Sequence, residues 1–219
     1  MRLDLRLYAL LDPVVSGGRS LTDLAKLIAD HATLVQLRDK HGSTRVLIEE
    51  AQTLRDVLKP KGVPLLINDR VDVALAVKVD GVHIGQSDMH AADARALLGR
   101  DAIIGLSINT VALAEEAPLE LLDYVGIGGV YTTTSKDNTK APIGVAGLRE
   151  IVRIVRARKP GFPICGIAGI TQANAGDVIA AGADGVAVIS ALSLALDPSK
   201  AARDMRAVVD AELSKRGRA

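Results

Sequence analysis

Short runs rich in Val, Ile and Leu recur along this chain of 219 residues, and most are followed by a turn and a segment with helical periodicity. Continuous apolar runs are typical of strands buried on both faces. Alternating strands and helices predict a parallel sheet, and about eight such units close into a barrel. The sequence therefore predicts an α/β fold, a (β/α)8 or TIM barrel with a closed parallel sheet. The expected strands centre on residues 7–10, 34–37, 65–67, 81–84, 103–106, 124–127, 164–167 and 186–189.

Helical segments lie between these runs, and some carry start or stop signals. Ser43 is placed to cap the second helix, and Gly182 to end the seventh in a left-handed conformation. A doubly wound sheet is the alternative, but neither a Gly-rich dinucleotide fingerprint nor a P-loop is present. No linker divides the chain, so we expect one domain over residues 1–219. The expected helices span residues 21–30, 44–58, 71–77, 91–98, 111–117, 145–158, 172–181 and 199–213.

An internal echo supports repeated βα units. Residues 72–85 (DVALAVKVDGVHIG) resemble residues 177–190 (DVIAAGADGVAVIS), with a helix followed by a strand in both segments. The helix–strand spacing differs by one residue between the copies. This pattern indicates repeated units of a barrel and not a solenoid.

Charge and composition exclude several classes of partner. The formal net charge is +1 and only 2% of the residues are aromatic, which argues against a nucleic-acid partner. Charges interrupt the apolar N-terminus, and no apolar stretch is long enough to span a membrane. The single cysteine, Cys165, fits a reducing compartment. We expect a soluble cytoplasmic protein and leave its oligomeric state open, a homo-oligomer included.

Polar side chains follow the second, third and fourth expected strands, where barrel enzymes carry their chemistry. Alternation places Gln36, Arg38 and Lys40 on one side of the chain, as a cationic patch suited to a polyphosphate. A solvated turn is the alternative. Asp69 and Asp88 follow neighbouring strands, and two carboxylates together with phosphate oxygens are a typical Mg2+ site. The alternatives are that Asp88 caps a helix and that Asp69 pairs with the adjacent arginine.

The later loops carry hydroxyls, glycines and a cation. Residues 131–136 (YTTTSK) gather hydroxyls and an ammonium group that together suit an anion, although a merely polar loop is the alternative. Gly169 and Ser190 follow the last two strands, whose loops form the common phosphate site of this fold. A glycine that serves only a tight turn is the other interpretation. His83 is more typical of a hydrogen-bonded barrel residue than of a catalyst, and Ser107 alone indicates little.

Five motifs in order make the chain similar to the thiamine phosphate synthases from about Leu7 to Asp197. They are QLRDK at residues 36–40, NDRVDVA at 68–74, GVHIGQSD at 81–88, TTSK at 133–136 and ADGVAVIS at 183–190. The resemblance implies a Mg2+-dependent transferase that joins a hydroxymethylpyrimidine diphosphate to a thiazole phosphate and releases pyrophosphate. It further implies a dissociative reaction, in which the thiazole nitrogen captures a pyrimidine-stabilised methylene cation.

The resemblance also assigns roles to individual residues. Asp69 and Asp88 are expected to bind one Mg2+. The residues expected to hold the pyrimidine diphosphate are Gln36, Leu37, Arg38, Asp39, Lys40, Asn68, Ser107 and Lys136, of which Arg38, Lys40, Ser107 and Lys136 are the expected catalytic group. The residues expected to bind the thiazole phosphate are Thr133, Thr134, Ser135, Gly169, Ile189 and Ser190.

The chain departs from the family pattern at three positions. Ser135 replaces a threonine and keeps the hydroxyl, Gly129 replaces a proline, and Ala168 replaces the first of two glycines near the phosphate. The last two changes bear on thiazole-phosphate affinity. Two other functions remain open from sequence alone: the related thiazole tautomerase, and a non-catalytic regulator that binds thiazole or thiamine phosphates. The retained Arg38, Lys40, Lys136 and aspartate pair favour the synthase.

Overall fold

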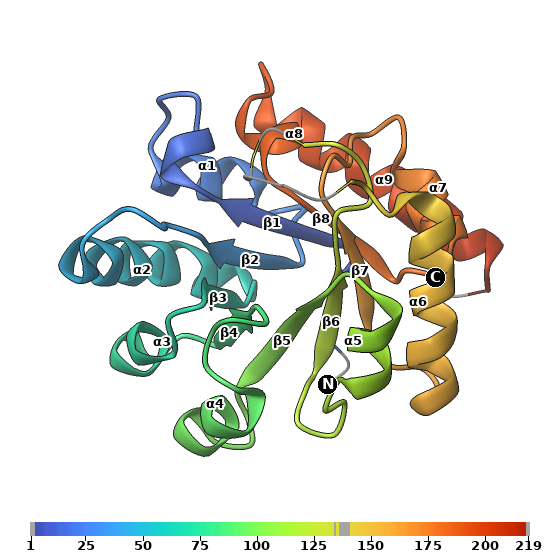
Figure 1. The fold of residues 1–219 in the computed structure, drawn as a ribbon. Helices are drawn as coiled ribbons and strands as arrows, with labels where there is room; N and C mark the ends of the chain where they lie inside the picture. Colours follow the sequence, from blue (N-terminus) through green and yellow to red (C-terminus); the bar gives the residue numbers. More distant parts are fainter. Residues whose placement is uncertain (1–2, 134, 136–140, 218–219) are drawn as a thin grey trace.

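A computed structural model describes residues 3–133, 135 and 141–217, and its strands form a closed parallel barrel in chain order from β1 to β8. Helices surround the strands in Figure 1. The barrel predicted from the alternating pattern is confirmed. The strands are β1 (Leu7–Leu11), β2 (Leu34–Leu37), β3 (Leu65–Asn68), β4 (Gly81–Ile84), β5 (Ile103–Ile108), β6 (Tyr124–Ile127), β7 (Ile164–Ile167) and β8 (Gly185–Val188).

The helices agree closely with the periodicity of the sequence. The Ser43 side chain accepts a hydrogen bond from the Val46 N–H and caps α2, and Gly182 adopts a positive φ of 115° after α7, as expected. The helices are α1 (Leu21–Ile28), α2 (Thr44–Leu58), α3 (Val71–Val77), α4 (Ala91–Leu98), α5 (Val111–Glu116), α6 (Gly144–Arg158), α7 (Ala175–Ala180), α8 (Ser190–Ser193) and α9 (Pro198–Lys215), with 3-10 turns η1 (Pro13–Val15) and η2 (Lys59–Lys61).

Two helical differences have local causes. Helix α7 begins at Ala175, three residues later than expected, because the Asn174 side chain accepts a hydrogen bond from the Thr171 N–H at 2.8 Å and closes a turn before the helix. The short helix α8 was not expected, since a single turn carries no periodicity to recognise. None of the helices in the described part of the chain is long and apolar enough to cross a membrane.

Each strand divides its side chains between two cores, as the period of two requires. Val35 and Leu37 of β2 point outward into the core beneath the helices. Leu34 points inward and joins the barrel interior with Tyr8 and Tyr124. Successive side chains of a strand therefore point alternately into the barrel interior and into the outer core. The inward-pointing residues at the C-terminal ends of the strands can then line a site.

The internal echo in the sequence has a structural explanation at the N-terminal ends of the strands. Asp80 and Asp184, in the two Asp-Gly-Val copies, accept hydrogen bonds from the first N–H groups of β3 and β7, at 2.8 and 3.0 Å. The glycines that follow have no space for a Cβ, because the Ile103 and Leu5 carbonyls lie against them. In both copies the motif thus joins the start of one strand, β4 or β8, to the start of the strand before it, β3 or β7.

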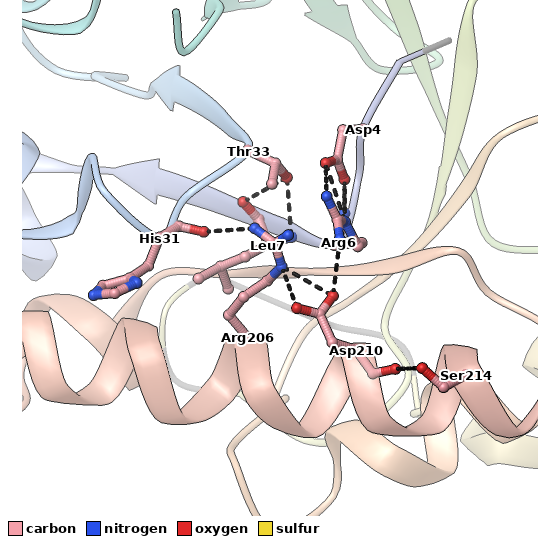
Figure 2. Close-up of polar contacts among 8 residues, drawn as sticks. All are labelled: Asp4, Arg6, Leu7, His31, Thr33, Arg206, Asp210 and Ser214. Carbon is pink, nitrogen blue, oxygen red and sulfur yellow. Dashed lines mark hydrogen bonds and ion pairs between the residues drawn. The ribbon is translucent and has the colours of Figure 1, made fainter. Parts of the chain in front are cut away.

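Helix α9 is fastened to the same end of the barrel by a polar cluster (Figure 2). Arg206 pairs with Asp210 at 3.0 Å and donates to the His31 carbonyl at 3.2 Å. Asp210 also accepts from Arg6 at 3.1 Å, beside Leu7 at the start of β1. Because both arginines share one carboxylate, the last helix and the first strand are held together.

Candidate active site

A cavity of about 160 Å3 opens where the C-terminal ends of the strands meet, and all the strands contribute to it. Gln36, Arg38 and Lys40 all line it, as the alternation along β2 predicted. Asn68, Asp69, Asp88 and Ser107 line the same cavity. The structure therefore brings together polar residues that lie up to 71 positions apart in the sequence, between 36 and 107.

Two residues of the expected substrate set do not line this cavity. Leu37 is fully buried in the outer core beneath the helices. The Asp39 carboxylate accepts from the N–H groups of His41 and Gly42, at 2.9 and 2.8 Å, and so shapes the loop. Their side chains support the backbone around the cavity, while their neighbours on either side face it.

Arg38 is held by a residue that sequence reasoning missed. The Asp12 carboxylate at the end of β1 accepts a hydrogen bond from the Arg38 guanidinium, and both side chains are nearly buried. Asp12 also accepts from the Val14 N–H at 2.9 Å and so caps η1. The Nε of Arg38 has no partner among the described residues. A polar residue after the first strand was a usable signal, but its pairing with β2 depends on barrel closure.

The two carboxylates lie together at the mouth of the cavity. Burial and the nearby Asp88 carboxyl raise the pKa of Asp69, while Lys40, with its Nζ 3.2 Å from Asp69, acts in the opposite direction. Asp69 has a left-handed φ of 63°, and Asp88 accepts from the Gly85 N–H at 2.7 Å. Neither simpler interpretation holds, because His90 precedes α4 as its cap residue and Arg70 pairs with Asp72.

The donor set fits Mg2+. Hard divalent cations prefer oxygen ligands, and Mg2+ typically binds one or two carboxylates together with phosphate oxygens and water. Burial is the main cause of the raised pKa of Asp69, and the neighbouring Asp88 carboxyl adds to it. A bound cation would favour the ionised form of both carboxyls. No cluster of three or more His, Cys, Asp or Glu side chains suited to a metal occurs among the described residues.

A hydrogen-bonded row of side chains forms the floor of the cavity. Gln36 Nε2 donates to the Tyr8 hydroxyl, which lies 2.8 Å from the Tyr124 hydroxyl. Tyr124 lies 2.8 Å from His83 Nδ1, and His83 Nε2 lies 2.8 Å from the Ser107 hydroxyl. His83 is thus a hydrogen-bonded barrel residue, as expected, but it contacts a candidate site residue directly.

Cys165 also lines this floor and is chemically quiet. Burial raises the pKa of its thiol to about 12, so the group stays protonated near neutral pH. A buried protonated thiol is a poor nucleophile. Cys165 is therefore a buried core residue and not a reactive thiol.

A second, smaller cavity of about 20 Å3 adjoins the first. Ile167 and Ala187 line both cavities and form the boundary. The second cavity is also lined by Thr133, Ser135, Gly169, Ile189 and Ser190, which are the described members of the set expected to bind a phosphate. Thr134 and Lys136 lie outside the described residues.

The backbone at this second cavity is tightly turned. Gly169 has a φ of 65°, and a Cβ there would overlap the Thr132 carbonyl. Ala168 precedes it with a φ of 85°, a conformation that favours glycine. The position where the family pattern has glycine is therefore one where the alanine methyl costs conformational energy.

Comparison with known proteins gives a consistent result. The model of the thiamine monophosphate synthase family matches residues 7–192. A thiamine-phosphate synthase of Chloroflexus aurantiacus is 49% identical over 94% of this chain and 94% of its own. One from Agrobacterium fabrum is 47% identical over 98% of both chains. The solved thiamine phosphate pyrophosphorylase of Pyrococcus furiosus superposes with a TM-score of 0.84 at 35% identity, over 97% of this chain and 98% of that one.

Proposed function

This chain belongs to the thiamine monophosphate synthase family, and from that membership we propose the reaction it catalyses. It joins 4-amino-5-hydroxymethyl-2-methylpyrimidine diphosphate to 4-methyl-5-(2-hydroxyethyl)thiazole phosphate, giving thiamine monophosphate and pyrophosphate. One observation carries the proposal. An acidic pair and two cations share a cavity with a polar floor, and a second cavity suited to phosphate adjoins it.

Departure of the diphosphate is the step that the first cavity supports. The C–O bond between the pyrimidine methylene and the diphosphate breaks, and both electrons leave with pyrophosphate. Arg38 and Lys40 lie where they neutralise the growing negative charge, and Lys136 is assigned the same task by its place in the family motif. Arg38 is prevented from turning away by Asp12.

Mg2+ on Asp69 and Asp88 would supply further charge neutralisation to the diphosphate oxygens. Asp69 and Asp88 would hold such an ion, and Lys40 lies beside Asp69. The Asp88 carboxylate is kept in place by the Gly85 N–H.

Capture of the methylene cation depends on where the second substrate lies. Thr133, Ser135 and the backbone at Gly169 and Ser190 bind the thiazole phosphate in the adjoining cavity. This binding aims the thiazole nitrogen across Ile167 and Ala187 at the methylene carbon. The nitrogen lone pair forms the new C–N bond, so no protein nucleophile is required.

The cellular setting follows from the same proposal. A biosynthetic reaction on small phosphorylated substrates and a free, buried Cys165 suit the cytoplasm. One (β/α)8 domain over residues 1–219 carries both substrate sites. Nucleic acid and membrane play no part in this reaction.

The test supplies the purified chain with both substrates and Mg2+ and measures thiamine monophosphate and pyrophosphate together. We expect equal amounts of the two products and no product after chelation of the metal. Rearrangement of the thiazole alone would assign the tautomerase reaction instead. Tight binding of either phosphate without any turnover would assign a regulatory role.

A further inference from the structure

The polar floor of the first cavity forms one continuous chain of hydrogen bonds across the barrel interior. It runs from Gln36 on β2 through Tyr8 and Tyr124 to His83 and ends at Ser107 on β5. The three contacts from Tyr8 to Ser107 are each 2.8 Å. The two ends, Gln36 and Ser107, belong to the set that the family resemblance assigns to the pyrimidine.

The donors and acceptors in this chain have a definite order. Gln36 Nε2 donates to Tyr8, and either hydroxyl can donate in the contact between Tyr8 and Tyr124. With Tyr8 accepting from Gln36, the arrangement that gives the Tyr8 hydrogen an acceptor within this row has Tyr8 donating to Tyr124. Tyr124 then donates to His83 Nδ1. A neutral imidazole that accepts at Nδ1 carries its proton on Nε2, and that proton is donated to Ser107. Burial raises the pKa of both phenols, so both keep their hydrogens.

The two ends of this chain of hydrogen bonds consequently offer different groups to a ligand, an acceptor at Gln36 and a donor at Ser107. Gln36 has its Nε2 occupied, and its buried Oε1 accepts no hydrogen bond from any residue in the described ranges. A buried acceptor without a partner is costly, and a ligand N–H would satisfy it. Ser107 accepts from His83 and keeps its own O–H for a ligand. The cavity therefore presents one acceptor and one donor.

Reversing the chain exchanges these two roles. If the Gln36 amide turned over, its oxygen would accept from Tyr8 and its NH2 would face the ligand. Every later hydrogen bond would then reverse, His83 would carry its proton on Nδ1, and Ser107 would donate to Nε2 and accept from the ligand. The two directions suit opposite ligands. An aminopyrimidine carries an N–H donor beside ring-nitrogen acceptors, and its oxo counterpart carries a carbonyl acceptor beside a ring N–H.

We propose that Tyr8, Tyr124 and His83 are positioning residues that hold this chain in one direction and so select an aminopyrimidine over an oxopyrimidine. This inference rests on the proposed function and deepens it. The residues act through Gln36 and Ser107 and do not contact the reacting atoms. The order imposed at one end of the chain fixes the hydroxyl orientation at the other.

A spectroscopic test addresses the order directly. The protein has four histidines in all. Histidine labelled with 15N gives separate signals for the two neutral tautomers, and the H83Q variant identifies the signal of His83. We expect a neutral ring with its proton on Nε2. A proton on Nδ1, or on both nitrogens, would overturn the proposal, because Tyr124 could not then donate to the ring.

A binding test addresses the selectivity. Calorimetry measures the affinity of wild type, Tyr124→Phe and Tyr8→Phe for 4-amino-5-hydroxymethyl-2-methylpyrimidine monophosphate and its 4-oxo counterpart. Wild type is expected to prefer the amino ligand by roughly 100-fold, since sites built for one donor pattern reject the opposite pattern strongly. Either substitution removes a hydroxyl and interrupts the chain of hydrogen bonds, and we expect the preference for the amino ligand to fall roughly tenfold. Equal preference in wild type and both variants would overturn the proposal.

Two controls separate a broken chain from a damaged fold or a wrong function. Affinity for Mg2+ with inorganic pyrophosphate, which binds at Asp69 and Lys40, is expected to stay unchanged in both variants, and thermal unfolding reports their stability. A loss of pyrophosphate affinity equal to the loss of amino preference would indicate general damage and contradict the proposal. Failure of wild type to form thiamine monophosphate would contradict the proposed function, whereas the histidine tautomer is measured without turnover.

Discussion

The two ends of the barrel differ in how they treat polar groups. At the N-terminal end, Arg95 donates to the Leu121 and Ala102 carbonyls and to Asp123, so its nitrogens are occupied by the protein. At the C-terminal end, Gln36 Oε1 and Arg38 Nε lack partners among the described residues. Arg156 at the N-terminal end also has two buried nitrogens without partners among the described residues, but its remaining nitrogen pairs with Asp184. The difference is that Gln36 and Arg38 line a cavity together with a pair of carboxyl groups.

The cavities sharpen this contrast. A cavity of about 750 Å3 lies at the N-terminal end, between the loops that lead into the strands. Several charges in its lining have partners, as in the Lys61–Asp30 contact at 2.8 Å, and Lys159 donates to the Leu119 carbonyl. The cavity at the other end is smaller, about 160 Å3, but holds the carboxyl pair and the unpaired atoms. The candidate site is therefore identified by the polar groups that line it and not by the volume of the cavity.

The largest expected effect is a loss of turnover when a carboxylate at the C-terminal end of the barrel is removed. Asp69→Asn or Asp88→Asn removes one of two carboxylates at the metal site, and we expect turnover to fall at least about 100-fold. Steady-state rates against Mg2+ concentration measure this. Asp72→Asn, an exposed aspartate paired with Arg70, is the matched control. Near-normal rates in both site variants would remove the metal from these residues.

The same variants carry a prediction for stability and pH. The pKa of Asp69 is raised in the folded chain, so the folded state holds this proton more tightly than the unfolded state. The stability it contributes at low pH is therefore lost as the pH rises through the folded pKa. Asp88→Asn lowers the pKa of Asp69 and lessens this loss. Unfolding curves from pH 4 to 8 without metal should show a shallower decline in that variant than in wild type.

A change at the N-terminal end should affect stability and leave the rate of the folded enzyme alone. Asp184→Ala removes the partner of Arg156, at 2.7 Å, and the acceptor of the Ile164 N–H. Breaking such a largely buried pair is expected to cost about 3 kcal/mol of the free energy of unfolding. Urea denaturation gives the cost, and turnover per folded molecule gives the control. A slowed rate at full folding would contradict the division between the two ends.

A smaller effect is expected at the C-terminal end from weakening the ion pair between Asp12 and Arg38. Asp12→Asn keeps an acceptor for the Val14 N–H but weakens the grip on Arg38. Since a hydrogen bond to a charged group is worth about 1.5–3 kcal/mol, we expect kcat/KM for the pyrimidine diphosphate to fall roughly tenfold or more. Unchanged kcat/KM would mean that Arg38 is positioned without Asp12.

The smallest expected effect tests backbone strain beside the second cavity. Ala168 has a φ of 85°, where glycine carries no Cβ penalty. Ala168→Gly is expected to stabilise the fold by about 1 kcal/mol and to tighten thiazole-phosphate binding. Thermal unfolding and calorimetry measure the two effects. Gly182→Ala, at another positive φ far from the cavity, should destabilise the fold, since its Cβ would meet Val152.

Much of the fold and part of the site followed from local pattern. The boundaries of α2, α3 and α4 matched the expected ranges because apolar periodicity is a property of adjacent residues, and at α2 the Ser43 cap adds to it. The set of Gln36, Arg38 and Lys40 followed from alternation along one strand. Helix α8 did not, because a single turn carries no periodicity. The left-handed Asp69 did not either, and its N–H donates to the His83 carbonyl of a neighbouring strand.

The sequence by itself determined the order of strands and helices, the identity of the polar residues at the strand ends, and the family. Tertiary structure alone decided which of those residues meet. Asp12 reaches Arg38, and Tyr8 reaches Tyr124 across 116 positions, only because the barrel closes. Periodicity is a property of neighbours in the chain, whereas a site is a property of neighbours in space.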